Sequence, residues 1–217
     1  MTPAAHRHLS ERDPVMRRLI REHGKCSLVP ETRRPPFQSL VLAVAHQQLN
    51  GTAAEAILRR FKSLFPGRRF PRPQDLARVT DGELRACGFS FAKIKALRDL
   101  AAKTLAGVVP APREIARLSD DEIIARLTQV RGVGRWTAEM LLIFQLGRGD
   151  VLPADDFGVR TGFRRAYRKR ELPKPKEILT HGEIWRPHRT TASWYLWCAA
   201  DAAKERKTDG APDSYLL

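Results

Sequence analysis

The sequence has few of the residues that build metal centres or disulfide frameworks. Its 217 residues include three cysteines, Cys26, Cys87 and Cys198, and no Cys-x-x-Cys pair. This spacing excludes a zinc ribbon, an iron–sulfur cluster and a disulfide-stapled domain. None of the six histidines has another four residues away, so no helical histidine pair indicates a catalytic metal. We therefore expect three free thiols in a reducing compartment.

Long apolar runs are also missing. No stretch approaches the roughly 18 apolar residues that a membrane-spanning helix needs. The first residues carry charges and lack the apolar core of a secretory signal. These absences predict a cytoplasmic protein that does not associate with membranes, and one that is nucleoid-associated if it is bacterial.

Acidic residues are scarce relative to basic ones. The chain has 39 Lys and Arg against 24 Asp and Glu, which gives a net charge of +15 and a pI near 10.5. A protein this basic commonly binds a polyanion, with DNA or RNA as the first candidate and an anionic membrane surface as the second. The alternative interpretation is a solvated basic surface without a specific partner. With 42% hydrophobic residues, the chain is long enough to fold as one domain or two small lobes.

Strand-like alternation of polar and apolar residues is absent over any long segment, and helical signals are frequent. Thr80 and Ser119 are each followed three residues later by glutamate, which predicts capping boxes at two helix starts. We also expect helices near Pro14–His23 and over Thr191–Lys204, with a frayed tail from Thr208. The sequence therefore predicts an all-α fold with at least eight helices.

Residues 37–65 predict two helices joined by a sharp corner. Asn50-Gly51-Thr52 separates two sets of apolar residues at helical spacing. We expect Gly51 to end the first helix and Thr52 to cap the second. The segment His46-Gln47-Gln48-Leu49 then lies at the corner.

A glycine-containing hairpin, Gly132-Val133-Gly134, lies between two further predicted helices. Glycine lets backbone N–H groups approach a phosphate closely, and the next helix directs its positive end at the anion. An ordinary tight turn between helices would give the same pattern. The hairpin alone therefore leaves both interpretations open.

Five segments in order resemble the helix-hairpin-helix-GPD superfamily of DNA glycosylases, and specifically the 3-methyladenine DNA glycosylase II branch. They are the corner at residues 46–49, the turn Gly88–Lys93, the hairpin Gly132–Ala138, the segment Pro153–Val159 and the C-terminal segment Trp185–Trp197. The resemblance covers about residues 35–205. It implies a two-lobe helical fold with a cleft between the lobes, which acts as a monomer on double-stranded DNA with alkylated bases.

The resemblance implies that Asp156 is the catalytic carboxylate. The transition state for cleavage of an N-glycosidic bond resembles an oxocarbenium ion, which a nearby carboxylate stabilises. The same group can orient or deprotonate the attacking water. The alternative is that the aspartates cap the helix that starts near Phe157, and we expect that role for Asp155.

Relatives that also nick the strand carry a lysine where this chain has Trp136, and that amine forms a Schiff base. The resemblance therefore implies a monofunctional glycosylase that leaves an intact abasic site. Alkylated purines are cationic, and aromatic faces attract them by about 0.5–2 kcal/mol. The substrate-binding residues implied are Trp136, Trp197, Phe157 and Met140, where relatives often have tyrosine in place of the methionine. Ordinary core packing is the alternative for each aromatic ring.

The resemblance also assigns DNA contacts, because the target base must leave the stack. Leu49 matches an intercalating wedge, although it could instead be a staple between two helices. The DNA-binding residues implied are Gln47, Gln48, Leu49, Gly132, Gly134, Arg135 and Thr137. No cofactor is implied apart from a structural Na⁺ or K⁺, held at the hairpin by the backbone carbonyls of Thr128, Val130 and Val133.

The implied organisation is an N-terminal segment, 1–36, that packs with the C-terminal lobe, a central lobe, 37–150, and a C-terminal lobe, 151–217. The N-terminal β-rich domain of longer relatives and the iron–sulfur loop of other branches are not expected here. Alternative functions are a glycosylase for hypoxanthine, uracil or an oxidised base, a non-catalytic helix-hairpin-helix DNA-binding module, and an RNA-binding protein. Neutral bases require polar groups that read the base edge, and the sequence places none.

Overall fold

The computed structural model describes residues 3–202, and all the regular secondary structure within them is helical. The all-α prediction is confirmed. The residues divide into two compact units, one formed by residues 3–32 and 142–202 and the other by residues 33–141. The division falls within helix α9 (Arg135–Phe144). The tail from Thr208, which we expected to fray, lies outside the described residues.

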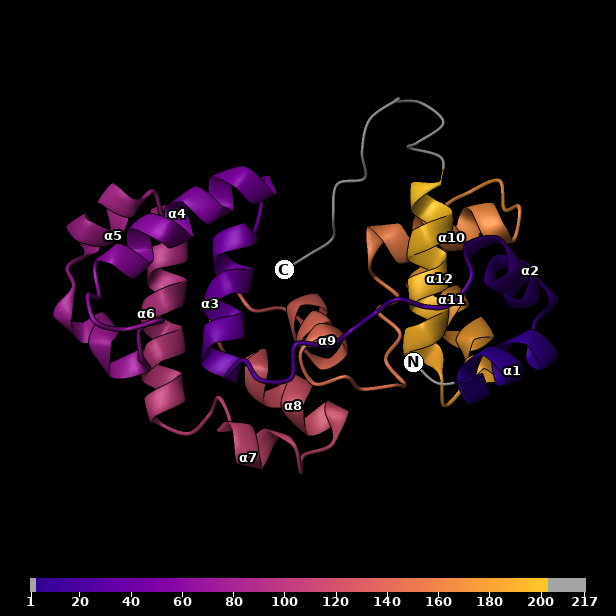
Figure 1. Cartoon of the computed structure of the whole chain (residues 1–217), viewed down its shortest axis with the longest axis horizontal. Coiled ribbons are helices and arrows are strands. Elements are labelled where there is room, and N and C mark those ends of the chain that lie inside the picture. Colours follow the sequence, from indigo (N-terminus) through magenta and orange to yellow (C-terminus); the bar gives the residue numbers. More distant parts are fainter. Residues whose placement is uncertain (1–2, 203–217) are drawn as a thin grey trace. The chain divides into compact units, whose positions relative to one another are not determined.

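The first unit combines both ends of the described chain (Figure 1). Its helices are α1 (Pro3–Arg12), α2 (Pro14–His23), α10 (Phe157–Ala166), α11 (Pro175–His181), the 3-10 helix η2 (Gly182–Trp185) and α12 (Arg189–Asp201). Helix α12 packs against both α10 and α2. Trp185, Tyr195 and Phe163 are fully buried in this unit.

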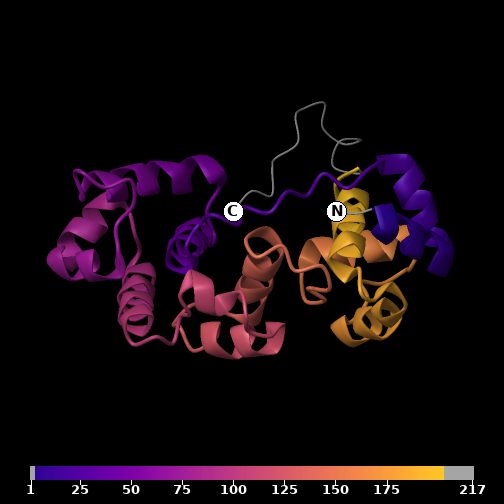
Figure 2. The same ribbon diagram turned by 60° about the horizontal axis from the view of Figure 1, so that its bottom comes forward.

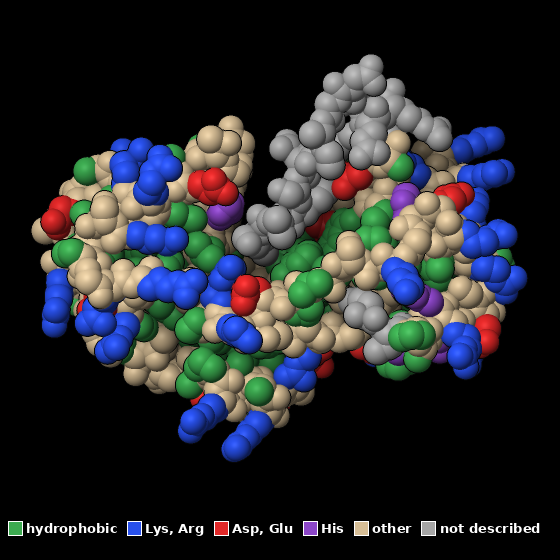
Figure 3. Space-filling view, viewed as in Figure 1, with side chains coloured by type: hydrophobic (Ala, Val, Ile, Leu, Met, Phe, Trp, Pro, Cys, Tyr) green, Lys and Arg blue, Asp and Glu red, His purple; other side chains and the backbone are tan. Residues whose placement is uncertain are grey.

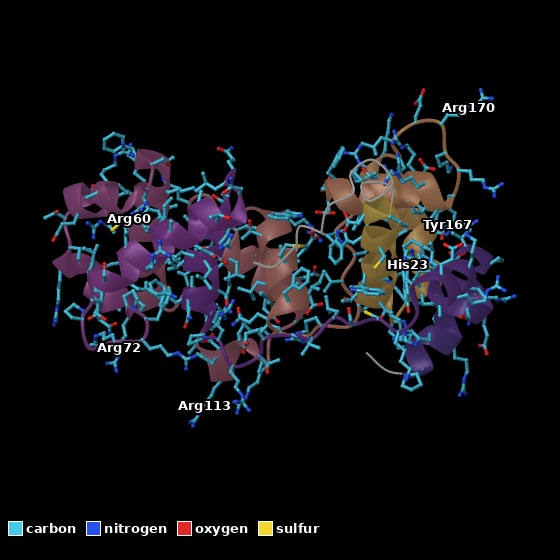
Figure 4. All side chains as sticks on the ribbon, turned by 45° about the horizontal axis from the view of Figure 1, so that its top comes forward. His23, Arg60, Arg72, Arg113, Tyr167 and Arg170 are labelled. Atoms are coloured by element: carbon cyan, nitrogen blue, oxygen red, sulfur yellow. The ribbon has the colours of Figure 1, made fainter. Side chains whose placement is uncertain are left out.

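A buried carboxylate helps to fasten the N-terminal helices to the unit. Asp13 caps α2 by accepting the N–H of Val15 at 2.8 Å. Its other oxygen accepts hydrogen bonds from the Tyr167 hydroxyl and, at 2.9 Å, from the Trp185 indole, and lies 3.1 Å from the His181 ring. Figure 4 labels Tyr167 on the segment that follows α10. Helix α2 has the predicted bounds, whereas α1 was not predicted.

The second unit is a continuous stretch of chain (Figure 2). Its helices are α3 (Pro36–His46), α4 (Gly51–Ser63), the 3-10 helix η1 (Pro73–Arg78), α5 (Asp81–Cys87), α6 (Phe91–Leu105), α7 (Pro112–Ile115), α8 (Asp120–Leu127) and the start of α9. Helix α6 packs against α3 and η1. Phe61, Phe89 and Leu97 lie in its core.

Local capping signals fix several helix starts in the second unit. The predicted capping boxes of Thr80 with Glu83 and of Ser119 with Glu122 are both present. The prediction for the corner was wrong in detail, because Asn50 and not Thr52 caps α4. The Asn50 side chain accepts the Ala53 N–H at 2.9 Å. Gly51 is the first residue of α4 and does not end α3.

Candidate nucleic-acid interface and catalytic carboxylate

The hairpin lies between α8 and α9 in the second unit, and Gly132 adopts a left-handed φ of 77°. Asp99 on α6 fastens it by accepting the Arg131 backbone N–H at 2.7 Å. Lys103, one turn further along α6, pairs with Asp99 at 2.9 Å and donates to the Gln129 carbonyl. Burial opposes ionisation of Asp99, but these donors outweigh it and hold the pKa of that carboxyl below its ordinary value.

The corner between α3 and α4 is tied directly to the hairpin. Gln47 donates from Nε2 to the Gly132 carbonyl at 2.8 Å. Gln48 is exposed and holds a left-handed φ of 58°, which is uncommon for a residue other than glycine. The Leu49 side chain is 40% exposed, so it is accessible and not buried between the helices.

A cavity of about 540 Å³ opens between the corner and the hairpin. Its lining residues come from the end of α3, the corner, the start of α6, the hairpin and α9, and they are Ala43, His46, Gln47, Gln48, Ser90, Ala92, Lys93, Ala96, Arg131, Gly132 and Trp136. Lys93 donates to the Ala45 carbonyl at 2.8 Å. Burial lowers the pKa of both His46 and Lys93. The cavity therefore combines basic groups with an aromatic ring, because Trp136 is 40% exposed.

The remaining predicted residues of α9 have varied surroundings. Arg135 is exposed and pairs with the buried Glu139 at 2.9 Å. The Gly134 carbonyl accepts the Ala138 N–H at 3.1 Å. Thr137 and Met140 are both buried.

The backbone carbonyls predicted to hold an ion lie in the same hairpin. The Val130 carbonyl accepts the Val133 N–H at 3.0 Å. These neutral oxygens fit the ligand chemistry of a hard cation.

Asp156 is positioned by the start of α10 in the first unit. Its Oδ1 accepts the Val159 N–H at 2.7 Å, so Asp156 itself is the N-cap of α10. The same oxygen accepts the Trp197 indole N–H at 2.8 Å. The capping role expected for Asp155 was wrong, because Asp155 is exposed in the preceding turn.

Trp197 is held on three sides. Its ring stacks on Phe144 with centroids 5.7 Å apart, and only 9% of the residue is exposed. A Cβ on Gly158 would lie 2.8 Å from the indole Cδ1, so only glycine leaves room for this ring. Phe157, by contrast, is 71% exposed at the first position of α10.

Sequence analysis missed several residues of these two clusters. Lys93 and His46 lie within the segments at residues 88–93 and 46–49, but only the fold places both of them at one cavity. Gly158 and Gly162 occupy one face of α10, and their four-residue spacing is the signal that could have indicated a close helix contact. Phe144 carried no signal apart from its place in an apolar helix.

No group of three or more His, Cys, Asp or Glu side chains within the described residues is arranged to hold a metal ion. The helices of residues 3–202 are each too short or too polar to cross a membrane. Lys and Arg side chains are widespread on the face drawn in Figure 3, with fewer Asp and Glu.

Comparison with known proteins gives consistent matches over most of the chain. The model of the HhH-GPD superfamily of base excision DNA repair proteins matches residues 41–187. DNA-3-methyladenine glycosylase 1 of Schizosaccharomyces pombe is 43% identical over 92% of this chain and 88% of its own length.

Two solved structures extend the likeness to the fold. The S. pombe 3-methyladenine DNA glycosylase Mag1, in complex with abasic DNA, has a TM-score of 0.80 at 42% identity, covering 96% of this chain and all of that one. A DNA-3-methyladenine glycosidase from Bacillus halodurans has a TM-score of 0.84 at 35% identity, covering 94% of this chain and 92% of that one. The chain therefore belongs to the HhH-GPD superfamily of base excision DNA repair proteins.

Proposed function

We propose that this protein is a monofunctional DNA glycosylase that removes alkylated purines of the 3-methyladenine and 7-methylguanine type. The observation that carries the proposal is the fixed Asp156 carboxylate, whose Oδ1 accepts hydrogen bonds from both the α10 backbone and the Trp197 indole. Relatives named as DNA-3-methyladenine glycosylases support the substrate class. The protein acts as a monomer on duplex DNA, in the compartment that contains the cell's DNA.

Asp156 acts on the sugar carbon C1′. As the base leaves with the electron pair of the N-glycosidic bond, positive charge develops on the sugar, and the carboxylate stabilises it. A water oxygen then bonds to C1′, and its proton passes to the carboxylate or to solvent. A fixed carboxylate needs no reorganisation in the transition state, so the hydrogen bonds from Val159 and Trp197 assist the reaction by positioning it.

The base itself needs little assistance, because an alkylated purine already carries positive charge and leaves readily. Trp136 in the second unit and Phe157 in the first unit are each exposed, and an aromatic face of either residue attracts such a cation. Trp197 is nearly buried, so its main contribution is to position Asp156. Met140 stands at a position where relatives often have a tyrosine. A soft apolar side chain without a hydroxyl favours recognition of the base by shape over recognition by a polar contact.

No strand cleavage accompanies base release. A lyase step needs an amine that attacks C1′ and forms a Schiff base. The resemblance to the superfamily implies that Trp136, which has no amine, stands where lyase members carry that lysine. The product is therefore an intact abasic site.

The hairpin and corner bind the DNA backbone and hold the opened base stack. Backbone N–H groups at Gly132 and Gly134 approach a phosphate of the DNA. Arg135 and Thr137, at the start of the next helix, belong to the same phosphate-binding segment. The carbonyls of Thr128, Val130 and Val133 would hold a monovalent cation, which would offset phosphate charge when bound. Gln47, Gln48 and Leu49 face the gap left by the flipped base.

The test is base release from methylated duplex DNA by the native protein and by Asp156→Asn. Asparagine is a good N-cap and its Oδ1 can accept the same two hydrogen bonds, so the fold is retained. We expect the rate of base release to fall by at least about 100-fold while binding to abasic DNA is retained. The readouts are free purine by chromatography and binding by fluorescence anisotropy.

A panel of duplexes with 3-methyladenine, 7-methylguanine, hypoxanthine, uracil or 8-oxoguanine identifies the lesion. Release of a neutral lesion in preference to the methylated purines would overturn the proposed substrate class. Native-level release by Asp156→Asn would overturn the role of Asp156. A covalent enzyme–DNA adduct trapped by borohydride would contradict the monofunctional assignment.

A further inference from the structure

We infer that Phe91 is a stacking platform for a base of the bound DNA, separate from the residues at the corner and hairpin. The inference rests on the proposed function only in taking duplex DNA as the ligand. Phe91 is the first residue of α6 and belongs to the Gly88–Lys93 turn, to which no role has been given. Phe91 is 67% exposed, whereas the neighbouring Phe89 is fully buried.

The Phe91 ring is braced from one side. The Arg85 guanidinium carbon lies 4.6 Å from the ring centroid, which is the geometry of a cation–π contact. Arg85 is itself fixed, because its Nη1 donates to the Phe89 carbonyl at 2.6 Å. The guanidinium therefore covers one face of the ring and limits its movement, while most of the ring remains accessible to a planar ligand.

The surroundings of Phe91 indicate a nucleic acid and not an apolar protein partner. Ser90 and Ala92, the residues on either side of it, both line the cavity between the corner and the hairpin. The same cavity is lined by Lys93 and Arg131 and does not include the Phe91 side chain, and Arg85 is the cation that contacts the ring. An exposed ring with a guanidinium on one face, adjacent in sequence to residues that line a basic cavity, suits a ligand with aromatic planes on a polyanionic backbone.

The chemistry of stacking makes such a platform indifferent to sequence. Every base has a π face, so one exposed ring can stack on whichever base it meets. Stacking is most available where the base stack has been opened, as at an abasic site. Phe91 should therefore contribute more to binding of abasic DNA than of undamaged duplex.

The test measures dissociation constants of Phe91→Ala, Phe91→Leu and Phe91→Tyr for a duplex with a tetrahydrofuran abasic analogue and for the matched undamaged duplex. We expect Phe91→Ala to weaken binding of the abasic duplex by about 5- to 150-fold, the range for loss of one base–aromatic stack. Phe91→Tyr should bind like the native protein. Phe91→Leu should lose most of the affinity, because it keeps apolar bulk without a planar face.

The matched control is Leu105→Ala. Leu105 is 58% exposed at the other end of the same helix, roughly 20 Å away at the rise of an α-helix. Its replacement should leave both affinities unchanged. Thermal unfolding of Phe91→Ala should match the native protein, since an exposed ring contributes little to the core.

Three outcomes would overturn the inference: native affinity of Phe91→Ala for the abasic duplex, native affinity of Phe91→Leu, or an equal loss in Leu105→Ala. Binding of the abasic analogue requires no base release, so it is independent of the glycosylase assay. If the native protein releases bases and Phe91→Ala binds normally, only this inference fails. If it releases none and binding still depends on Phe91, only the proposed function fails.

Discussion

Oδ1 of Asp156 combines a structural and a chemical role in one atom. It caps α10 through the Val159 N–H and accepts the Trp197 indole N–H. Both donors hold the carboxylate in one rotamer, and the helix end adds partial positive charge beside it. The capping alternative for this residue therefore does not compete with the catalytic proposal, because a cap restricts the side chain as catalysis requires.

At the residue scale, replacement of Gly158 tests whether the contact between Trp197 and Asp156 matters for the reaction. In Gly158→Ala the new Cβ would lie 2.8 Å from the Trp197 ring and 3.0 Å from Asp156 Oδ1, so the indole must move. We expect base release at saturating DNA to fall about tenfold or more, which corresponds to losing one hydrogen bond to a charged group. Single-turnover kinetics measure this rate, and anisotropy should show little change in DNA binding.

Gly82→Ala is the control, since a Cβ there meets nothing closer than 3.7 Å. It should release bases at the native rate. Native kinetics for Gly158→Ala would mean that the contact between Trp197 and Asp156 does not matter for the reaction.

Gly162, one turn after Gly158, sets the distance between α10 and α12. A Cβ at this position would lie 1.8 Å from the backbone carbonyl oxygen of Leu196. Backbone cannot rotate away as a side chain can, so the two helices are in direct contact at this point. This contact fixes the register of Trp197 on α12 relative to Asp156 at the start of α10.

Gly162→Ala should therefore act on stability. Overpacking usually costs about 1–3 kcal/mol, and a clash with backbone should reach or exceed the upper end, even though alanine is the better helix former. Urea unfolding followed by circular dichroism measures the loss. Gly51→Ala is the control, because its Cβ has no neighbour within 4 Å, and a similar loss in that variant would contradict the explanation.

Sequence signals predicted the elements whose determinants are local. Thr80 and Ser119 each have their glutamate partner three residues away, so their helix starts could be read directly. At the corner, Asn50 and Thr52 are both good caps, and tertiary geometry decided between them. Helix α1 could not be predicted because it lacks an acidic first turn, and its buried residues, Ala5 and Leu9, are too few for a clear period.

The residues of the candidate site also divide into those that sequence motifs predicted and those that only the fold revealed. The roles proposed for Asp156 and Trp136 came from motifs that are contiguous in sequence. The contact of Trp197 with Phe144 and the bracing of Phe91 by Arg85 are tertiary contacts between residues without a shared motif. Such contacts leave no pattern in one sequence, so only the fold could reveal them.

At the scale of the whole molecule, the Asp13 carboxylate and the side chains of Tyr167, His181 and Trp185 around it make the stability of the fold depend on pH. Burial raises the pKa of Asp13, but hydrogen bonds from His181, Tyr167 and Trp185 outweigh it and hold that pKa well below its ordinary value. The pKa of Asp13 is lower in the folded state than in the unfolded state. Its contribution to the free energy of unfolding is therefore complete above about pH 4 and is lost as the pH falls below that value.

Asp13→Asn tests this contribution. The asparagine NH₂ would face groups that also donate, so we expect the free energy of unfolding to fall by about 3 kcal/mol at pH 7. The difference from the native protein should narrow between pH 4 and pH 2.5. Urea titrations across that range measure it, and a difference that stays constant with pH would exclude Asp13 as its source.

The partners of Asp13 lie 154 to 172 residues further along the chain. A ribosome therefore releases α1 and α2 long before the groups that their anchor requires have been synthesised. The second unit is a continuous stretch of chain and can fold before the first unit is complete. The N-terminal helices reach their native contacts only after Trp185 has been synthesised. During translation, α1 and α2 therefore reach their native place only after residues that are synthesised much later.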